Sequence, residues 1–343
     1  MQEEFAAEQR ALAATCWQLV GLRSDLAQPN SWIRRTVFGT DIFVQSFAGE
    51  LRGFHNVCAH RGFPLRLADA GLGPVQCGFH GWVYSKEGVP TGIPRNAELF
   101  QISREQQKTL ALAPVRIEAI GQFVFASLLP TAPPLADYLG PYADVWRAID
   151  SGLGTAVHLE SAITTANWKR HVEITMDDYH LAHVHPTTFG AGGDAELQRF
   201  FYERHGRHSC YMRRRDPDWT FESFWDGVRR GVPDPTGYKI FNSFPNSLIA
   251  TSADVCVAWV AAPISSRSTR VDLYLIPWTH VPLEGETRQA LIDFNVKVAG
   301  EDRRACETWQ TAVDQLAHPP VLGALERRIG WFREAYAEVL GAQ

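Results

Sequence analysis

Hydrophobic and polar residues alternate with a period of two along several stretches of the first third of the chain. Asp41 to Phe47 and Glu50 to Asn56 show this alternation on either side of Ala48-Gly49, which predicts a β-hairpin. Val115 to Ile117 and Gln122 to Ser127 predict a second hairpin, with a glycine in the turn between them. We therefore expect the first third to form a small, mostly antiparallel β domain.

An amphipathic stretch over residues 5 to 20 predicts a helix at the start of this domain. The clearest break in the pattern is the run Leu-Pro-Thr-Ala-Pro-Pro at residues 129–134, because proline continues neither a helix nor a central strand. We place the domain boundary there, between a first domain of residues 1–130 and a second domain of residues 131–343.

The second domain alternates strand-like and helical patterns. Strands are predicted at 155–164, 238–242, 255–261 and 270–277, with a helix near His180 and a long amphipathic helix from about 284 to 313. A sheet with helices packed on one face gives the fold class α+β. Residues 186–236 are rich in glycine, arginine and aspartate, which is typical of a pocket wall or lid and equally of a plain surface excursion.

Two short motifs in the first domain each pair one cysteine with one histidine. They read Cys58-Ala59-His60-Arg61-Gly62 and Cys77-Gly78-Phe79-His80-Gly81-Trp82. Two thiolates on one iron and two imidazoles on the other are what a Rieske [2Fe–2S] cluster needs, and glycines let both loops turn tightly. A structural zinc site is the main alternative, but its usual spacing pairs cysteine with cysteine and histidine with histidine. We expect Cys58, His60, Cys77 and His80 to hold a [2Fe–2S] cluster.

The second domain contains a run of acids and histidines. Asp177 lies three residues before His180, so on a helix the two would share a face. His185 lies five residues after His180, a spacing that needs a π-type bulge, or a helix that breaks where Pro186 disfavours helical geometry. Spacing alone equally allows His183 as the partner of His180.

These residues and the N-W-K motif at 167–169 resemble the Rieske non-haem iron oxygenases, large subunit. The resemblance implies a helix-grip catalytic domain in which His180 and His185 bind a mononuclear Fe(II), with His183 left as a core or supporting residue. The stretch E-D-x-x-x-C-E-x-x-Q from residue 301 implies Asp302 as the third ligand, with Glu301 as its competitor. Two histidines and one carboxylate leave positions open for O2 and substrate.

The same resemblance gives Asp177 a role between the two metal centres. In the family, head-to-tail trimers place the cluster of one subunit next to the iron of its neighbour, and a carboxylate bridges the histidines. Asp177 matches that bridging residue, with Asp178 as the nearest alternative. One departure is Ile174, where many members have asparagine, so hydrogen bonding near Glu173 is expected to differ.

Composition agrees with an intracellular enzyme. The chain has 343 residues, 45% of them hydrophobic and 21% charged, with a net charge of −5 that argues against nucleic acid as a partner. Its six cysteines show no disulfide pattern, and the acidic start shows no secretory signal. No apolar stretch reaches the length of a membrane span, so we expect a cytoplasmic location.

The predicted function is that of a terminal oxygenase in a multicomponent system. No G-x-G-x-x-G motif or flavin motif is present, so electrons from NAD(P)H are expected to arrive through a separate ferredoxin or flavin reductase. We expect a homotrimer that hydroxylates or oxidatively demethylates a small organic substrate with O2. A ring-dihydroxylating dioxygenase with a β subunit is an alternative, and so is a non-catalytic Rieske electron carrier.

The substrate is left open by the sequence. Eleven tryptophans suggest an aromatic cage for a quaternary ammonium compound, although aromatic residues more often fill cores. An aromatic acid, an N-methyl compound or an O-methyl compound is equally consistent with the residues.

Overall fold

The computed structural model of the chain describes residues 2–189, 200–213, 238–252, 254–281 and 284–341. It divides into two compact units, one made of Ala13–Pro134 and the other of Met1–Leu12 together with Leu135–Gln343. The division after Pro134 falls at the end of the proline-rich run, close to the expected boundary at 130/131. Among the described residues, no helix combines the length and the hydrophobicity needed to cross a membrane.

The unit Ala13–Pro134 is built on a seven-stranded antiparallel sheet in the order β1-β9-β8-β4-β3-β2-β5. Its strands are β1 (Gln18–Leu22), β2 (Ser31–Val37), β3 (Thr40–Phe47), β4 (Glu50–His55), β5 (Ala70–Leu72), β8 (Pro114–Ile120) and β9 (Phe123–Ser127). The pairs β3/β4 and β8/β9 confirm the two predicted hairpins. A two-stranded sheet of β6 (Val83–Tyr84) and β7 (Pro90–Gly92) and the short helices α2 (Asn96–Leu99) and α3 (Arg104–Thr109) complete it.

The opening helix differs from the prediction in both length and partner. Helix α1 covers Gln2–Ala13 and ends before β1, which begins at Gln18 and pairs with β9. The carboxylate of Glu8 accepts a hydrogen bond from Trp168 Nε1 at 2.7 Å and contacts the ammonium of Lys169 and the hydroxyl of Tyr336. This polar anchor explains why α1 groups with the second unit, whereas we had assigned it to the first.

The second unit contains another seven-stranded antiparallel sheet, in the order β10-β16-β15-β14-β13-β12-β11. Its strands are β10 (His158–Thr164), β11 (Phe200–His205), β12 (His208–Arg213), β13 (Lys239–Ser243), β14 (Ser247–Thr251), β15 (Val255–Ser265) and β16 (Ser268–Pro277). Its helices besides α1 are α4 (Leu135–Leu139), α5 (Tyr142–Asp150), α6 (Trp168–Ile174), α7 (Leu181–Val184), α9 (Gly285–Gln310) and α10 (Arg327–Gly341). The sheet and its helices confirm the α+β class.

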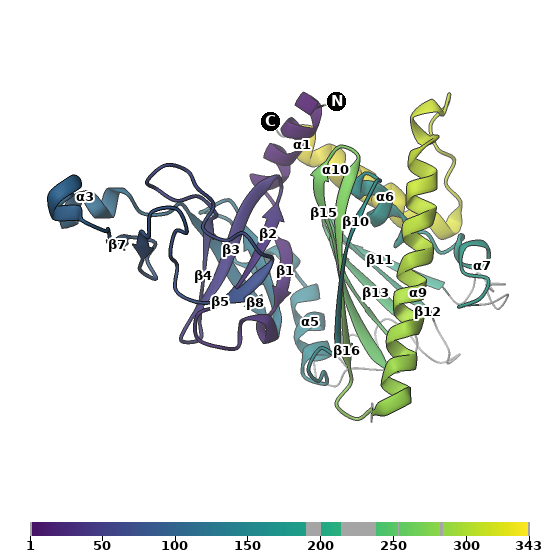
Figure 1. Cartoon of the computed structure of the whole chain (residues 1–343). Helices are drawn as coiled ribbons and strands as arrows, with labels where there is room; N and C mark the ends of the chain where they lie inside the picture. The colour runs from purple at the N-terminus through teal and green to yellow at the C-terminus, as the bar shows by residue number, and fades with distance from the viewer. Residues whose placement is uncertain (1, 190–199, 214–237, 253, 282–283, 342–343) are drawn as a thin grey trace. The chain divides into compact units, whose positions relative to one another are not determined.

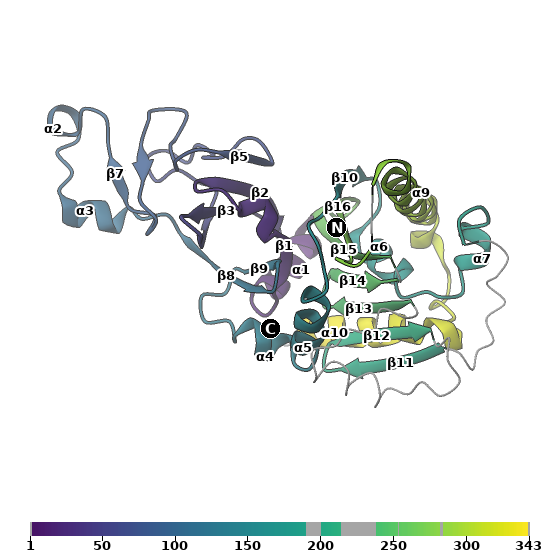
Figure 2. The same cartoon turned by 90° about the horizontal axis from the view of Figure 1, so that it is seen from below.

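Figure 1 shows α9 running along the strands of this sheet, and Figure 2 shows the same helix nearly end-on beside α6. Helix α6 packs against both α9 and β15, while α10 packs against β12. The expected loop-rich region 186–236 is not one excursion, because β11 and β12 run through its middle and pair with each other. The remainder, 190–199 and 214–236, lies outside the described residues, so the expectation of a lid there has no structural counterpart to compare.

Candidate metal centres and an adjoining cavity

The two Cys/His loops of the first unit have the same backbone geometry. In each loop the cysteine carbonyl accepts a hydrogen bond from the amide of the glycine four residues later, at 2.9 Å for Cys58 and Gly62 and 3.0 Å for Cys77 and Gly81. Both glycines adopt positive φ, +76° and +73°, as the motifs predict. Gly78, expected to be a third such glycine, is absent from the positive-φ positions of the described chain.

The loops bring together two buried thiols and two accessible imidazoles. The side chains of Cys58 and Cys77 are each 2% exposed, and the Cys58 Sγ lies 3.0 Å from the hydroxyl of Tyr84. Burial raises the pKa of the Cys58 thiol, the Tyr84 hydroxyl lowers it, and the neighbouring Cys77 thiol raises it further. The Nδ1 atoms of His60 and His80 lie 3.2 Å apart, a separation suited to two ligands of one metal ion. Two thiolates and two imidazoles match the donor set of a Rieske cluster.

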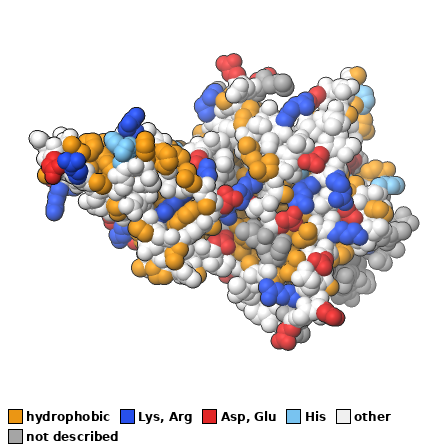
Figure 3. Space-filling view, viewed as in Figure 1, with side chains coloured by type: hydrophobic (Ala, Val, Ile, Leu, Met, Phe, Trp, Pro, Cys, Tyr) orange, Lys and Arg blue, Asp and Glu red, His pale blue; other side chains and the backbone are white. Residues whose placement is uncertain are grey.

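The surface beside the two histidines is apolar. His60 stacks on Trp82 with ring centroids 4.9 Å apart, and Phe79 and Phe100 are 52% and 39% exposed. Figure 3 shows histidine and hydrophobic side chains next to each other on this unit. Apolar surface of this kind is typical of a site that another protein covers.

In the second unit, three side chains point their ligand atoms at one position. His180 Nε2 lies 3.2 Å from His185 Nε2 and 3.4 Å from Asp302 Oδ1, and His185 Nε2 lies 3.0 Å from Asp302 Oδ1. Metal–ligand bonds of about 2.1 Å at right angles put neighbouring ligand atoms about 3 Å apart. Asp302 Oδ1 is buried and receives no well-aligned hydrogen bond from the described residues, so a cation bound between the three ligand atoms would satisfy it. The donor set therefore fits a facial-triad metal ion.

The backbone breaks where the spacing of the two histidines demands it. Helix α6 ends ahead of the triad, and Asp177 Oδ1 then accepts hydrogen bonds from the amides of Tyr179 at 2.8 Å and His180 at 3.1 Å. His185 follows the short helix α7 with φ −115° and ψ 47°, outside helical geometry, as the position before Pro186 predicts. The shared helix face that we expected for Asp177 and His180 is replaced by this turn.

The outer nitrogen of each histidine is held in place. His180 Nδ1 lies 2.5 Å from the backbone carbonyl of Asp177, and His185 Nδ1 lies 2.9 Å from Glu301 Oε2. The hydroxyl of Thr188 donates to the same Glu301 oxygen at 2.8 Å. These contacts fix both rings with Nε2 toward Asp302 and place Glu301, its competitor in the sequence, on the opposite side of the His185 ring.

The triad is arranged for a positive charge. Burial lowers the pKa of His180, but the carboxylates of Asp177 and Asp302 outweigh it and raise the pKa to about 10. The pKa of His185 is raised for the same reason, with Asp302 and Glu301 outweighing burial. The two imidazoles in turn hold the pKa of Asp302 below its usual value although burial opposes this. A divalent cation would compete with protons for these atoms.

Three other histidines or acids of this region lie away from the ligand position. His183 is exposed, so the expectation that it supports the site or fills the core is wrong, because its side chain leaves α7 toward solvent. Asp178 is buried and pairs with Arg328 at 3.3 Å. His171 is buried, and its Nε2 lies 2.7 Å from the Thr164 hydroxyl.

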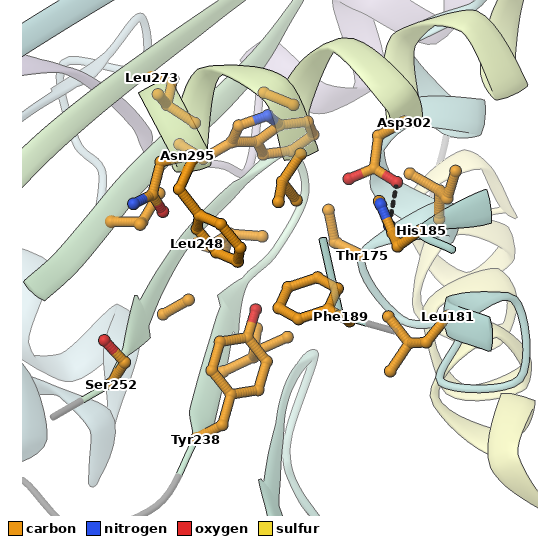
Figure 4. A pocket seen from close by; sticks show the side chains of 18 of the residues that line it. Thr175, Leu181, His185, Phe189, Tyr238, Leu248, Ser252, Leu273, Asn295 and Asp302 are labelled. Carbon is orange, nitrogen blue, oxygen red and sulfur yellow. Dashed lines mark ion pairs between the residues drawn. The ribbon is translucent and has the colours of Figure 1, made fainter. Parts of the chain in front are cut away.

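A cavity of about 320 Å³ adjoins the triad, between α9 and one face of the sheet. Helix α9 contributes residues at helical spacing, namely Leu291, Phe294, Asn295, Val298, Ala299 and Asp302. The sheet contributes alternate residues of neighbouring strands, which include the cross-strand pairs Leu248/Trp259 and Ala250/Val257. Figure 4 shows these walls, with Asn295 and Ser252 on the opposite side of the view from His185 and Asp302. The sequence predicted the amphipathic helix from its period, but it did not show which face of the sheet the helix would cover.

Comparison with known families covers both units. The family model "Ring hydroxylating alpha subunit (catalytic domain)" matches residues 150–342, and the "Rieske [2Fe-2S] domain" matches residues 16–108. The carnitine monooxygenase oxygenase subunit of Acinetobacter baumannii is 28% identical over 241 residues, which are 64% of this chain and 62% of that protein. The large oxygenase component of the 2,4-dinitrotoluene dioxygenase system of Burkholderia sp. is 30% identical over 56% of this chain and 44% of its own.

Solved structures resemble the whole chain. The quaternary ammonium Rieske monooxygenase CntA with γ-butyrobetaine superposes with a TM-score of 0.77 at 21% identity, over 100% of this chain and 93% of the other. Naphthalene 1,2-dioxygenase from Rhodococcus sp. gives a TM-score of 0.79 at 18% identity, over 98% and 92%. At such identities the likeness concerns the fold. In sequence, the chain spans less than two thirds of the length of the curated relatives.

Proposed function

The chain belongs to the ring-hydroxylating alpha subunits with a Rieske domain, and on this premise we propose that it is the terminal oxygenase component of a multicomponent system. The observation that carries the proposal is the convergence of His180, His185 and Asp302, with an otherwise unsatisfied buried carboxylate oxygen. Bound at these sites, the cluster supplies single electrons and the iron supplies O2 activation. A Rieske electron carrier has no use for this second site.

The ligand assignment extends from the sequence motifs to named atoms. We propose that Cys58 and Cys77 hold one iron of the cluster, that His60 and His80 hold the other, and that the triad holds Fe(II) through two Nε2 atoms and Asp302 Oδ1. The distances between these atoms and the anchored outer nitrogens support this assignment.

We further propose that the protein works as a homotrimer in which Asp177 connects the two metal centres of neighbouring subunits. The Asp177 carboxylate keeps an oxygen 3.8 Å from His180 Nδ1, and its side chain is 21% exposed, so a partner's imidazole could reach it. The apolar surface around His60 and His80 supports the existence of a covering subunit. One of the related CntA structures is described in terms of inter-subunit electron transfer.

The electron source and reaction class complete the proposal. Electrons come from NAD(P)H through a separate ferredoxin or flavin reductase, because the chain has no dinucleotide motif of its own. Hydroxylation or oxidative demethylation is favoured over ring dihydroxylation, since the carnitine monooxygenase subunit matches 64% of this chain and the 2,4-dinitrotoluene dioxygenase component 56%. Six cysteines without a disulfide support a cytoplasmic location.

Iron counting tests the central claim. The purified protein, reconstituted anaerobically with iron and sulfide, should be reddish-brown and contain three irons and two acid-labile sulfides per chain. With a surrogate reductase it should consume NADH and O2 in the presence of a substrate. Two irons per chain would indicate an electron carrier, and a colourless zinc protein would exclude both functions.

A further inference from the structure

Apart from the triad and Asp177 beside it, the described residues of the cavity offer a substrate no unpaired buried charge. Arg303 carries the only guanidinium among the described residues of the cavity wall, and it is paired with Glu160. The carboxylate of Asp178 is paired with Arg328. Asp254 is exposed to solvent, and the remaining acids surround the triad. A charged molecule in this cavity would lose its hydration without gaining a buried partner of opposite charge.

Uncharged hydrogen-bonding atoms, in contrast, remain available. The Asn295 amide nitrogen donates to the backbone carbonyl of Leu291 at 2.9 Å, and no described residue hydrogen-bonds to its Oδ1, which can act as an acceptor. Figure 4 shows Asn295 and the hydroxyl of Tyr238 among the side chains of the cavity wall. Burial raises the pKa of Tyr238, so its hydroxyl keeps its proton and can donate or accept. The apolar side chains around them include Leu248 and Trp259.

We propose that the cavity takes an uncharged, largely apolar substrate carrying a hydroxyl or N–H group, and that Asn295 Oδ1 accepts the hydrogen bond from this group. The proposal rests on the oxygenase function proposed above and names its substrate class. It also separates this chain from related proteins whose ligands are L-carnitine and γ-butyrobetaine, since both of those molecules carry charges.

Helix α9 sets the distance between the hydrogen bond and the reacting end of the substrate. Asn295 and Asp302 are seven residues apart on one face of this helix, which corresponds to about 10 Å along its axis. A substrate anchored at Asn295 therefore reaches the metal with the end opposite its hydroxyl or N–H group. Oxidation is expected at that far end.

Four probes with one scaffold separate the substrate classes. They are 4-ethylphenol, 4-ethylanisole, 4-ethylbenzoate and (4-ethylphenyl)trimethylammonium, which present a donor, a blocked donor, an anion and a cation. Calorimetric titration of the anaerobic holoprotein should give 4-ethylphenol the tightest binding. We expect its Kd to be about tenfold lower than that of 4-ethylanisole, the effect of one hydrogen bond, and lower still relative to the two ions.

Substitution of Asn295 tests whether the difference in Kd between 4-ethylphenol and 4-ethylanisole comes from its Oδ1 atom. Asn295→Leu should raise the Kd of 4-ethylphenol about tenfold, to that of 4-ethylanisole, while leaving 4-ethylanisole binding unchanged. Gln289→Leu is the matched control, because Gln289 is an exposed residue of the same helix outside the cavity. Cluster absorbance and total iron report whether each variant is folded. If Asn295→Leu does not fold, Asn295→Asp is the second test and should favour the trimethylammonium probe.

Several outcomes would overturn the proposal. They are tightest binding of the cation or the anion, equal binding of 4-ethylphenol and 4-ethylanisole, or no binding of any probe. Because binding requires no turnover, the two proposals fail separately. Selective binding without NADH and O2 consumption contradicts the oxygenase function, whereas turnover of other substrates with the wrong binding order contradicts only the substrate class.

Discussion

The two candidate metal sites are built in opposite ways. The cluster ligands lie between positions 58 and 80, on two loops that share a hydrogen-bond pattern and a positive-φ glycine. The triad draws His180 and His185 from the ends of α7 and Asp302 from α9, so it forms only when α9 packs beside α7. The first site is a property of local sequence, and the second is a property of the tertiary fold.

The two sites also differ in access. His80 is exposed, as a site that exchanges electrons with another protein requires, whereas His185 is 1% exposed at the end of a cavity. An enclosed metal ion is protected from bulk water and meets only what the cavity admits. The difference matches the two tasks, electron transfer and substrate oxidation, that we propose for this protein.

Asp302→Ala should have the largest effect, because it tests whether the triad can lose its metal while the cluster site stays intact. It removes the only carboxylate ligand of the triad, so iron should fall from three to two per chain and turnover should be lost. The cluster spectrum should not change, because the cluster loops belong to the other compact unit. Asp293→Ala, an exposed acid of the same helix, is the control. Loss of cluster colour in Asp302→Ala would mean that the sites depend on each other.

Asp177→Asn tests the proposed link between the sites. The variant keeps the shape but loses the charge, so all three irons should remain while turnover falls about 100-fold. Rapid mixing with substrate and O2 should show slow reoxidation of the reduced cluster. Reoxidation at the wild-type rate would place the bridge elsewhere, and Asp178 is a poor alternative because it is already paired with Arg328.

Glu301→Gln probes the support of the triad rather than its ligands. The amide keeps the size of the side chain but weakens the contact with His185 Nδ1, so affinity for the mononuclear iron should fall about tenfold. Competition with a chelator of known affinity measures the change, with cluster absorbance as internal reference. An unchanged affinity would show that the negative charge of Glu301 is not needed to hold the His185 ring.

Gly62→Ala gives the smallest effect and tests the local character of the cluster site. No atom crowds this position, but its φ of +76° should cost an alanine about 1 kcal/mol. The midpoint for loss of cluster absorbance in denaturant measures it. Gly78→Ala is the matched control, because its nearest neighbour is Phe63 Cε1 at 4.0 Å and its φ is ordinary. Equal midpoints would contradict the loop geometry.

Features formed by residues close together in the sequence were mostly predicted correctly, whereas features that depend on tertiary packing were predicted only in part. The hairpins and the Cys/His loops were predictable because their patterns lie within a few residues, as in β3 and β4. The helix expected over 5 to 20 was wrong at its end, because residues 19–22 are a short apolar run in the strand Gln18–Leu22, which pairs with β9. A run of that length does not distinguish a strand from a buried helical turn.

The triad was only partly accessible to sequence reasoning. Family resemblance pointed to His180 and His185, whereas local spacing left His183 as an open alternative. The structure shows that the chain breaks before α7 and that His183 on this short helix is exposed to solvent. The roles of Asp302 and Glu301 could not be separated by composition, since adjacent acids look alike until the helix is docked. Strands β11, β12 and β14 and helix α10 were not predicted at all, because their patterns are short or mixed.

Helix α9 carries both a wall of the cavity and a candidate metal ligand, so it physically links the substrate cavity to the triad. Asn295 and Asp302 belong to one rigid element, so a molecule that pushes the wall outward also displaces the carboxylate at the triad. We therefore expect occupancy of the cavity to affect the metal site through this helix itself. A molecule too thick for the cavity would be expected to bind but to displace the Asp302 carboxylate from the metal. Substrate selectivity would then depend on the shape of the molecule as well as on its binding affinity.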